Sequence, residues 1–346
     1  MLSSRESKLL EYIRKNPMQS SKEIHDGLQL TIGYATTKRS LTVLINKGLI
    51  TIEGQGKGTK YKTESNVNLL NTINPDSYFE TEIDDRDINN QFNFKLISQD
   101  LKTLPLFTTN EIKKLHALQN TYLKKSSQLS YSGYQKELER LAIDLSWKSS
   151  QIEGNTYTLL ETELLLKEQQ TAQGKTRDDA TMLLNHKTAL DFIFEHPDYL
   201  EPLTKLRLED IHSLLIKELG VETHIRNSRV GISGTNYKPL DNAFQITEAI
   251  EAMCKLIQTK QSVFEKAFLA LLLISYIQPF EDGNKRTARI VSNAILINNN
   301  YCPISFRTVD SIDYKKAMLI FYEQNNISAM KSIFINQFEF AVDTYF

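Results

Sequence analysis

The sequence predicts a mainly α-helical protein with a small N-terminal domain and a larger helical core that carries one short β-hairpin. Three observations lead to this prediction. Residues 1–64 show three short helical patterns followed by a hairpin pattern. Residues 111–346 place apolar side chains at helical spacing along almost their whole length. Residues 65–110, between these parts, break both patterns with a cluster of acidic residues.

The N-terminal pattern is typical of a winged helix-turn-helix. Ser20 followed by Glu23 is a capping-box pattern and marks the start of the second helix. A glycine-rich turn separates two short β patterns after the third helix. We expect helices over 4–16, from Ser20 to about Gly27 and over 34–47, and strands over 49–52 and 59–63.

This N-terminal domain is positively charged, since its eleven Lys and Arg residues against six Asp and Glu residues give +5. A DNA-binding winged helix places its third helix in a groove and its wing against phosphates. The candidate DNA contacts are Thr36, Thr37, Lys38, Arg39, Lys57 and Lys60. Many winged helices bind proteins instead, so a protein partner is the alternative to duplex DNA.

Residues 65–110 combine many acidic side chains with interleaved aromatic ones. An acidic cluster over residues 76–87 contains only Arg86 as an opposing charge and comprises Asp76, Glu80, Glu82, Asp84, Asp85 and Asp87. The aromatic residues are Tyr78, Phe79, Phe92 and Phe94. We interpret this stretch as an acidic linker that packs in part against a neighbour, and a solvated surface segment is the alternative.

The core from residue 111 onward is expected to be almost wholly helical. The predicted helices lie near 110–127, 131–153, 160–168, 177–195, 204–218, 245–258, 262–277, 284–299, 311–324 and 329–343. Residues 228–240 are the exception, because their glycine and asparagine residues supply turn conformations. We expect a short hairpin there.

The most informative stretch is an apolar helix, a tight polar loop and a second helix over residues 271–294. Pro279 ends the first helix, and turn-forming residues precede the second. The second helix therefore begins with several unpaired backbone N–H groups, which suit a phosphate. The charged residues in its first turns are all cations, Lys285, Arg286 and Arg289, which oppose the helix dipole unless an anion neutralises them.

Asp282, at the start of this loop, adds a carboxylate of the kind that holds Mg²⁺ beside substrate phosphates. The pattern therefore predicts a site for a phosphate with its metal. The alternative from the pattern alone is a loop capped by Asp282 whose arginines pair with surface acids.

The run QPFEDGNKRTAR resembles the signature of the Fic (Fido) family, HPFxDGNGRxxR, and the resemblance covers roughly residues 130–340. It implies ATP and Mg²⁺ as ligands and transfer of AMP to a hydroxyl of a target protein. Asp282 would hold the Mg²⁺. By resemblance the nucleotide would contact Phe280, Asp282, Gly283, Asn284, Lys285, Arg286, Arg289 and Tyr314. Residues 228–240 resemble the family's flap, which aligns a target segment through Ile232, Gly234 and Tyr237.

Two residues depart from that signature. Gln278 occupies the position of the family's histidine, which takes the proton of the target hydroxyl, and a glutamine amide cannot act as that base. Lys285 replaces the family's common glycine, and Asn-Lys-Arg resembles Doc-like members, which phosphorylate their target. Gly283 and Arg289 fit the AMP-transferring form better.

A second motif precedes the core. The run from Ser149 to Gly154 resembles the family's inhibitory motif, Ser/Thr-x-x-x-Glu-Gly/Asn, on a helix expected over about 131–154. The resemblance implies that Glu153 pairs with Arg289 and blocks the productive pose of the terminal phosphate. From periodicity alone, an exposed glutamate is the alternative.

The remaining composition restricts the classes of protein. Only two cysteines occur, Cys254 and Cys302, which argues against a disulfide scaffold. The N-terminus lacks the apolar stretch of a signal peptide, and no apolar run reaches the length of a membrane span. We expect a cytoplasmic protein without a membrane partner. The sequence leaves both a monomer and a homodimer as alternatives.

Three functions remain as hypotheses. The first is an autoinhibited Fic-type AMP transferase weakened by Gln278. The second is a non-catalytic regulator that senses nucleotide and binds DNA. The third is a Doc-like phosphotransferase.

Overall fold

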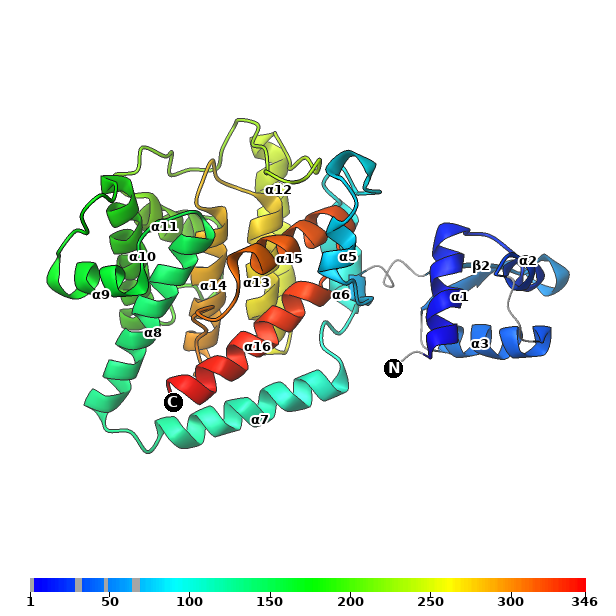
Figure 1. The fold of residues 1–346 in the computed structure, drawn as a ribbon, viewed down its shortest axis with the longest axis horizontal. Coiled ribbons are helices and arrows are strands. Elements are labelled where there is room, and N and C mark those ends of the chain that lie inside the picture. The colour runs from blue at the N-terminus through cyan, green and yellow to red at the C-terminus, as the bar shows by residue number, and fades with distance from the viewer. Residues whose placement is uncertain (1–2, 29–32, 47–48, 64–68) are drawn as a thin grey trace. The chain divides into compact units, whose positions relative to one another are not determined.

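The computed structural model describes residues 3–28, 33–46, 49–63 and 69–346, apart from the side chains of Ser4, Ser7 and Lys57. The chain divides into two compact units, Met1–Asn71 and Thr72–Phe346 (Figure 1).

The first unit has the winged-helix order that the sequence predicts. Its elements are α1 (Ser4–Lys15), α2 (Ser21–Gly27), α3 (Tyr34–Asn46), β1 (Ile50–Glu53), a 3₁₀ turn (Gly56–Gly58) and β2 (Lys60–Thr63), with the two strands antiparallel. The predicted capping box at Ser20 and Glu23 is present. Apolar residues from all three helices and β1 form one core, namely Leu9, Leu10, Ile13, Ile24, Leu41, Leu44 and Ile50.

The acidic segment belongs to the second unit from residue 72 onward. Its short elements are α5 (Pro75–Phe79), a 3₁₀ turn (Ile83–Asp85), a π-helical turn (Leu96–Asp100) and α6 (Leu101–Thr103). Leu96, Ile97, Leu101 and Leu106 are buried. Apolar burial therefore folds residues 72–110 onto the helical core, so this part of the predicted linker is packed, whereas residues 65–68 lie outside the described residues.

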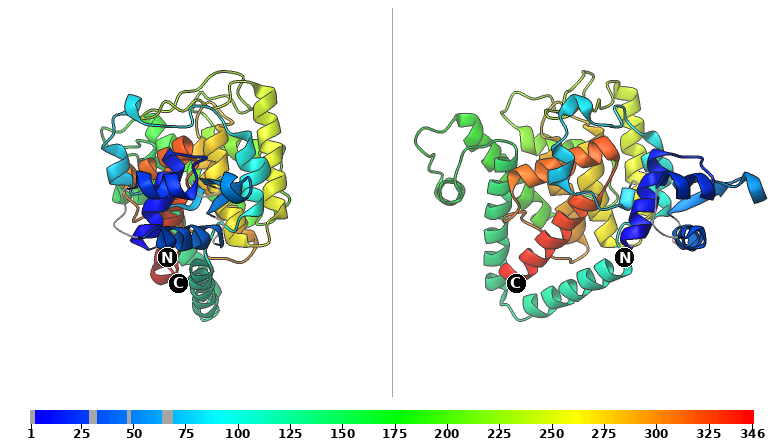
Figure 2. Two further views of the ribbon diagram at one scale, coloured as in Figure 1. Left: turned by 90° about the vertical axis from the view of Figure 1, so that its right-hand side faces the viewer. Right: turned by 45° about the vertical axis from the view of Figure 1, so that its right-hand side comes forward.

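The helical core follows the predicted elements closely. Its helices are α7 (Thr109–Ser126), α8 (Tyr131–Ile152), α9 (Leu159–Glu168), α10 (Arg177–Glu195), α11 (Lys205–Ile216), α12 (Ala243–Thr259), α13 (Val263–Ile277), α14 (Asn284–Asn298), α15 (Ser311–Gln324) and α16 (Ser328–Thr344). In Figures 1 and 2, α13 and α14 lie side by side with other helices around them. None of the described helices has the length and apolar character needed to cross a membrane.

Residues 228–240, which we call the flap segment, differ from the predicted hairpin. Its two arms flank a turn at Ser233 and Gly234, but the described residues contain no strand ladder between them. Its single bridge joins Lys238 to Gln91 in parallel.

A buried side chain explains why the flap segment closes without a ladder. Arg226, which is 2% exposed, donates from Nη1 to the Ser228 carbonyl at 2.6 Å and from Nη2 to the Leu240 carbonyl at 2.5 Å. Its Nε donates to the Gln278 carbonyl at 2.7 Å. One guanidinium therefore joins both ends of the flap segment to the loop between α13 and α14.

Candidate functional site

The loop between α13 and α14 has a backbone that only particular residues adopt easily. Gly283 has φ +80°, and a Cβ there would lie 3.3 Å from Ile216 Cγ2, so glycine suits both the conformation and the space. Gly283 is also the N-cap of α14 and supplies no side-chain cap. The first N–H groups of α14 are therefore left for a ligand.

Asn284 and Phe280 support this loop from inside. Asn284 accepts from the Phe280 N–H and donates to the Phe280 carbonyl, both at 2.8 Å. Phe280 is fully buried and stacks on His212, with ring centroids 3.6 Å apart. Both side chains are buried, and their contacts hold the loop in shape. They are thus turned inward, and the expectation that these two residues contact nucleotide stays a prediction.

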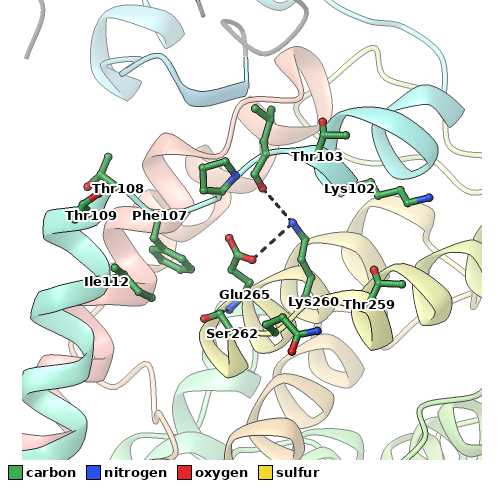
Figure 3. Close-up of a pocket in the computed structure, with 13 residues that line it drawn as sticks. Lys102, Thr103, Phe107, Thr108, Thr109, Ile112, Thr259, Lys260, Ser262 and Glu265 are labelled. Carbon is green, nitrogen blue, oxygen red and sulfur yellow. Dashed lines mark hydrogen bonds and ion pairs between the residues drawn. The ribbon is translucent and has the colours of Figure 1, made fainter. Parts of the chain in front are cut away.

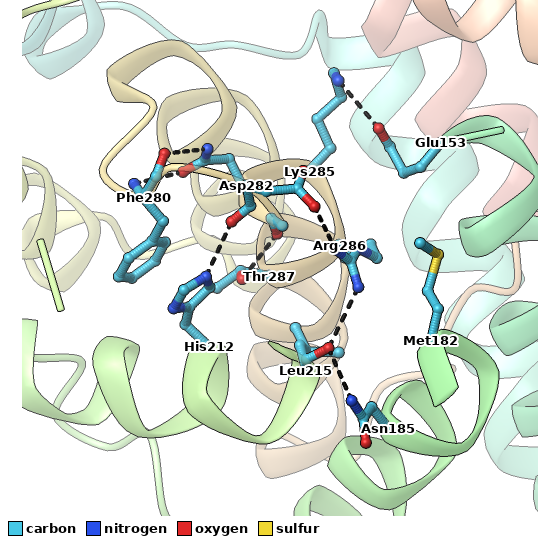
Figure 4. Close-up of polar contacts among 12 residues, drawn as sticks. Glu153, Met182, Asn185, His212, Leu215, Phe280, Asp282, Lys285, Arg286 and Thr287 are labelled. Atoms are coloured by element: carbon cyan, nitrogen blue, oxygen red, sulfur yellow. Dashed lines mark hydrogen bonds and ion pairs between the residues drawn. The ribbon is translucent and has the colours of Figure 1, made fainter. Parts of the chain in front are cut away.

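Asp282 and Arg286 form an ion pair at the edge of the loop (Figure 4). Arg286 Nη2 donates to Asp282 Oδ2 at 2.9 Å. The Asp282 side chain is 66% exposed, whereas that of Arg286 is 1% exposed. Buried Arg286 Nε has no hydrogen-bond partner among the described residues. The pair therefore combines an accessible carboxylate with a guanidinium that has spare donor capacity.

His212 is a residue beside the loop that the sequence analysis did not identify. Its Nε2 lies 2.9 Å from the Asp282 carbonyl oxygen, and its Nδ1 lies 3.2 Å from that of Thr223. Burial lowers the pKa of His212, although these two carbonyls oppose the change. No local signal marks His212, because the contact to the loop spans 70 positions of sequence.

The segment from Ser149 to Gly154 and the loop meet at Arg289. Arg289 Nη2 donates to Glu153 Oε1 at 2.8 Å, and Lys285 Nζ donates to Glu153 Oε2 at 3.1 Å. Arg289 also donates from Nε to Ser149 Oγ at 2.8 Å and from Nη2 to the Ser149 carbonyl at 2.9 Å. The structure thus brings together Ser149, Glu153 and the two cations, and both carboxylate oxygens of Glu153 are in use.

The Glu153 carboxylate stays charged despite its location. Burial alone would raise its pKa, but Arg289 and Lys285 outweigh that effect and lower the pKa to about 2. A lowered pKa stabilises the folded form above the ordinary pKa of the group, and this contribution is lost only as pH falls through the folded value. The contact of Glu153 with Arg289 is therefore expected to persist at neutral pH and to weaken only near pH 2.

Gln278 is placed beside the loop but is occupied with holding it. It has a left-handed backbone, φ +51°, and is 8% exposed. Its Nε2 donates to the Ser275 carbonyl at 2.6 Å, and its Oε1 accepts from Asn284 at 3.1 Å.

Two further predicted residues lie in the core. Tyr314, expected to contact nucleotide, is fully buried, and its ring centroid lies 5.2 Å from the guanidinium carbon of Arg289. Tyr237, expected to align a target, is 2% exposed and stacks on Tyr276. Both rings pack against neighbours, whereas Ile232 is half-buried and Gly234 is exposed in the flap segment.

The candidate DNA contacts of the first unit differ in how exposed their side chains are. Thr37 is wrong as a DNA contact, because it is fully buried and its Oγ1 lies 2.9 Å from His25 Nδ1. Lys38 and Arg39 are exposed, and Thr36 is half-buried. Lys60 pairs with Glu23 at 2.9 Å, and the side chain of Lys57 lies outside the described residues.

A cavity of about 820 Å³ opens elsewhere, between the α6–α7 connection and the α12–α13 turn (Figure 3). Lys260 donates to the Leu104 carbonyl at 3.1 Å across it and lies 3.6 Å from Glu265. None of the predicted site residues lines this cavity.

Comparisons with known proteins agree with the two units. Residues 202–296 match the model of the Fic/DOC family. Residues 2–72 match the penicillinase repressor family. Protein adenylyltransferase Fic from Nematostella vectensis is 27% identical over 176 residues, which cover 49% of this chain and 40% of that protein. The protein of the same name from Drosophila willistoni is 28% identical over 159 residues, covering 44% and 31%. The chain thus spans less than half the length of these curated relatives.

Solved structures share the fold of the second unit. Fic-1 from C. elegans superposes with a TM-score of 0.58 at 17% identity, covering 68% of this chain and 72% of that one. A Fic family protein from Desulfovibrio desulfuricans G20 gives a TM-score of 0.57 at 19% identity, covering 69% and 75%. At these identities the likeness shows the fold alone.

Proposed function

This chain carries a Fic/DOC family domain after an N-terminal winged helix, and from that premise we propose that it binds ATP and transfers AMP to a hydroxyl of a target protein. Its activity is held low by Glu153, which occupies Arg289, and is lowered further by Gln278.

The observation that carries the proposal is the balance of charge at the start of α14. Lys285, Arg286 and Arg289 lie in its first turns, where cations are unfavourable without an anion. In this structure Glu153 and Asp282 are their carboxylate partners, and Glu153 is the residue that caps the end of α8. A triphosphate would replace Glu153 with phosphate oxygens, which guanidinium groups bind strongly.

The residues present fit Mg²⁺ only together with a phosphate ligand. The described residues contain no group of three or more His, Cys, Asp or Glu side chains that could hold a metal ion. Mg²⁺ is commonly bound by one or two carboxylates with phosphates and water, so the exposed Asp282 would hold it, and the ion would neutralise phosphate charge.

Labelled ATP tests the proposal directly. Incubation with α-labelled and with γ-labelled ATP, each scored for label on protein, separates the three functions. Label from the α position alone supports AMP transfer, and label from the γ position supports a Doc-like phosphotransferase. ATP binding without label on any protein contradicts both transferases.

ATP binding without labelling would favour a nucleotide-sensing regulator, and the contacts of Gln278 also favour that function. Both polar atoms of the Gln278 amide are hydrogen-bonded, Nε2 to the Ser275 carbonyl on α13 and Oε1 to Asn284. Such a side chain maintains the shape of a binding loop and supplies no base for catalysis.

We expect Arg289→Ala to weaken Mg-ATP binding about 10- to 100-fold, since it removes charge-assisted hydrogen bonds to a phosphate. The measurement is calorimetric titration in the Glu153→Gly background, so that no carboxylate is left without its partner. Arg177→Ala is the control, because that arginine is 85% exposed and pairs with Glu218 outside the loop. Equal affinities of the Arg289 and Arg177 variants would contradict the assigned contact.

We also propose that the first unit binds duplex DNA through the exposed start of α3. Lys38→Ala, Arg39→Ala should weaken binding of the whole chain and reduce the slope of log affinity against log salt by about one for each phosphate that is no longer neutralised. Arg5→Ala, Lys8→Ala removes the same charge from α1 and is the matched control. Equal weakening in both variants would show non-specific attraction, and no binding at low salt would favour a protein partner.

A further inference from the structure

Residues 83–93, which we call the strap, run along the flap segment. The Lys238 N–H donates to the Asn90 carbonyl at 3.0 Å, within the parallel bridge to Gln91. Asn236 Nδ2 donates to Asp84 Oδ1 at 2.9 Å. The strap therefore holds the arm that follows the flap turn at two places along its length.

Arg86 adds a contact at the flap turn itself. Its Nη1 donates to the Gly234 carbonyl at 3.3 Å and to Glu323 Oε1 at 3.0 Å. The side chains of Arg86 and Glu323 are 9% and 1% exposed, and Tyr78 donates its hydroxyl to Glu323 Oε2 at 2.6 Å. A buried carboxylate needs such partners, so Glu323 on α15 fixes where the Arg86 guanidinium lies.

The strap and the flap segment also share a support near the loop. Phe92 stacks on Tyr276 with ring centroids 4.8 Å apart, and Tyr237 stacks on the same ring at 5.0 Å. The Asn93 N–H donates to the Tyr276 hydroxyl at 3.0 Å. Tyr276 lies two residues before Gln278, so both segments are positioned from the end of α13.

We infer that Arg86 is a positioning residue that fixes the flap segment relative to the loop between α13 and α14. The strap uses the arm at 234–238, and residues 229–233 make no main-chain hydrogen bond to another main-chain group of the described part. That arm is left for an extended segment of a target protein. The strap does not compete as a substrate, because residues 82–97 contain no Ser, Thr or Tyr.

Hydrogen–deuterium exchange tests the positioning role of Arg86 without requiring activity. Only the use of the flap segment for aligning a target protein rests on the proposed function. In Arg86→Ala we expect exchange in the peptide 228–240 to rise about fivefold or more, since local order decreases. Exchange in α13 should not change. Lys316→Ala, which removes the exposed ion pair of α15 with Asp76, is the matched control and should leave the flap peptide unchanged.

Further variants separate positioning from stability. Arg86→Ala leaves the buried Glu323 carboxylate without its cation. The double variant Arg86→Met, Glu323→Gln removes both charges, so that no unpaired charge is buried. Arg86→Lys should restore the melting temperature but not flap protection. An ammonium group has no counterpart to Arg86 Nε, which donates to the Thr81 carbonyl at 3.1 Å and helps to orient the guanidinium. Asn236→Ala, at an exposed hydrogen bond, should raise flap exchange by a smaller factor.

Unchanged flap exchange in folded Arg86→Met, Glu323→Gln would overturn the inference, as would an equal rise in α13, which would show global destabilisation. Mg-ATP titration of the same variants distinguishes the two proposals. If the wild type binds no ATP, the proposed function fails while the exchange result still decides the role of Arg86.

Discussion

Replacing Glu153 with glycine is expected to raise the apparent affinity for Mg-ATP and the rate of protein labelling by about 10- to 100-fold. In the wild type, a phosphate must first displace Glu153 from Arg289 and Lys285. Hydrogen bonds to charged groups are worth about 1.5–3 kcal/mol, and a binding-competent state that is rarely populated reduces affinity by its population. Calorimetric titration and label transfer from α-labelled ATP measure the two effects.

Two variants of the same kind show whether charge is the cause. Glu153→Gln keeps the shape of the side chain and removes its charge, so it should give a large part of the increase. Glu163→Gln makes the same change at a half-exposed carboxylate paired with Lys167 and should have no effect. If Glu153→Gly matches the wild type in affinity and labelling, Glu153 is not an inhibitor and its contact with Arg289 is structural.

Gln278→His, made in the Glu153→Gly background, is expected to accelerate AMP transfer by about 10²–10⁴-fold, the usual contribution of a general base. An attacking hydroxyl must lose its proton, and an imidazole with a pKa near about 6.5 accepts it at neutral pH. The backbone at Gln278, φ +51°, is one that histidine adopts more readily than most residues. The substitution should therefore preserve the backbone conformation at this position, and the measurement is the rate of label transfer from α-labelled ATP.

Gln278→Ala in the same background is the control for the loop contacts. It removes the hydrogen bonds to Ser275 and Asn284 without supplying a base, so it should not accelerate transfer. Equal rates for the histidine and alanine variants, with Mg-ATP still bound, would mean that a missing base does not limit this protein. The nucleotide-sensing regulator would then be the better account.

The fold was largely predictable because its signals are local. Helix periodicity and caps gave α7 to α16 within a few residues at each end, and the order of short elements gave the winged helix. The loop between α13 and α14 and the motif ending at Glu153 were also found, because each is one continuous run of sequence. Their meeting at Arg289 followed from the family resemblance alone.

The residues that the sequence did not reveal act through contacts between distant segments. His212 and Arg86 reach their partners across 70 and 237 positions, and neither has a neighbouring residue that marks its role. Arg226 replaces the expected hairpin ladder with side-chain hydrogen bonds to carbonyls, which periodicity cannot show. The prediction that Thr37 contacts DNA was wrong for a similar reason. Its hydroxyl lies against half-buried His25 on α2 instead of facing solvent, and the sequence does not show this contact.

The left-handed backbone at Gln278 also has a genetic consequence. Glutamine and histidine codons share their first two bases, so a third-position substitution exchanges the two residues. Most other replacements at this position would meet a backbone that disfavours them, whereas histidine tolerates it. A single-base change in the gene is therefore enough to place a histidine at this position with little backbone strain.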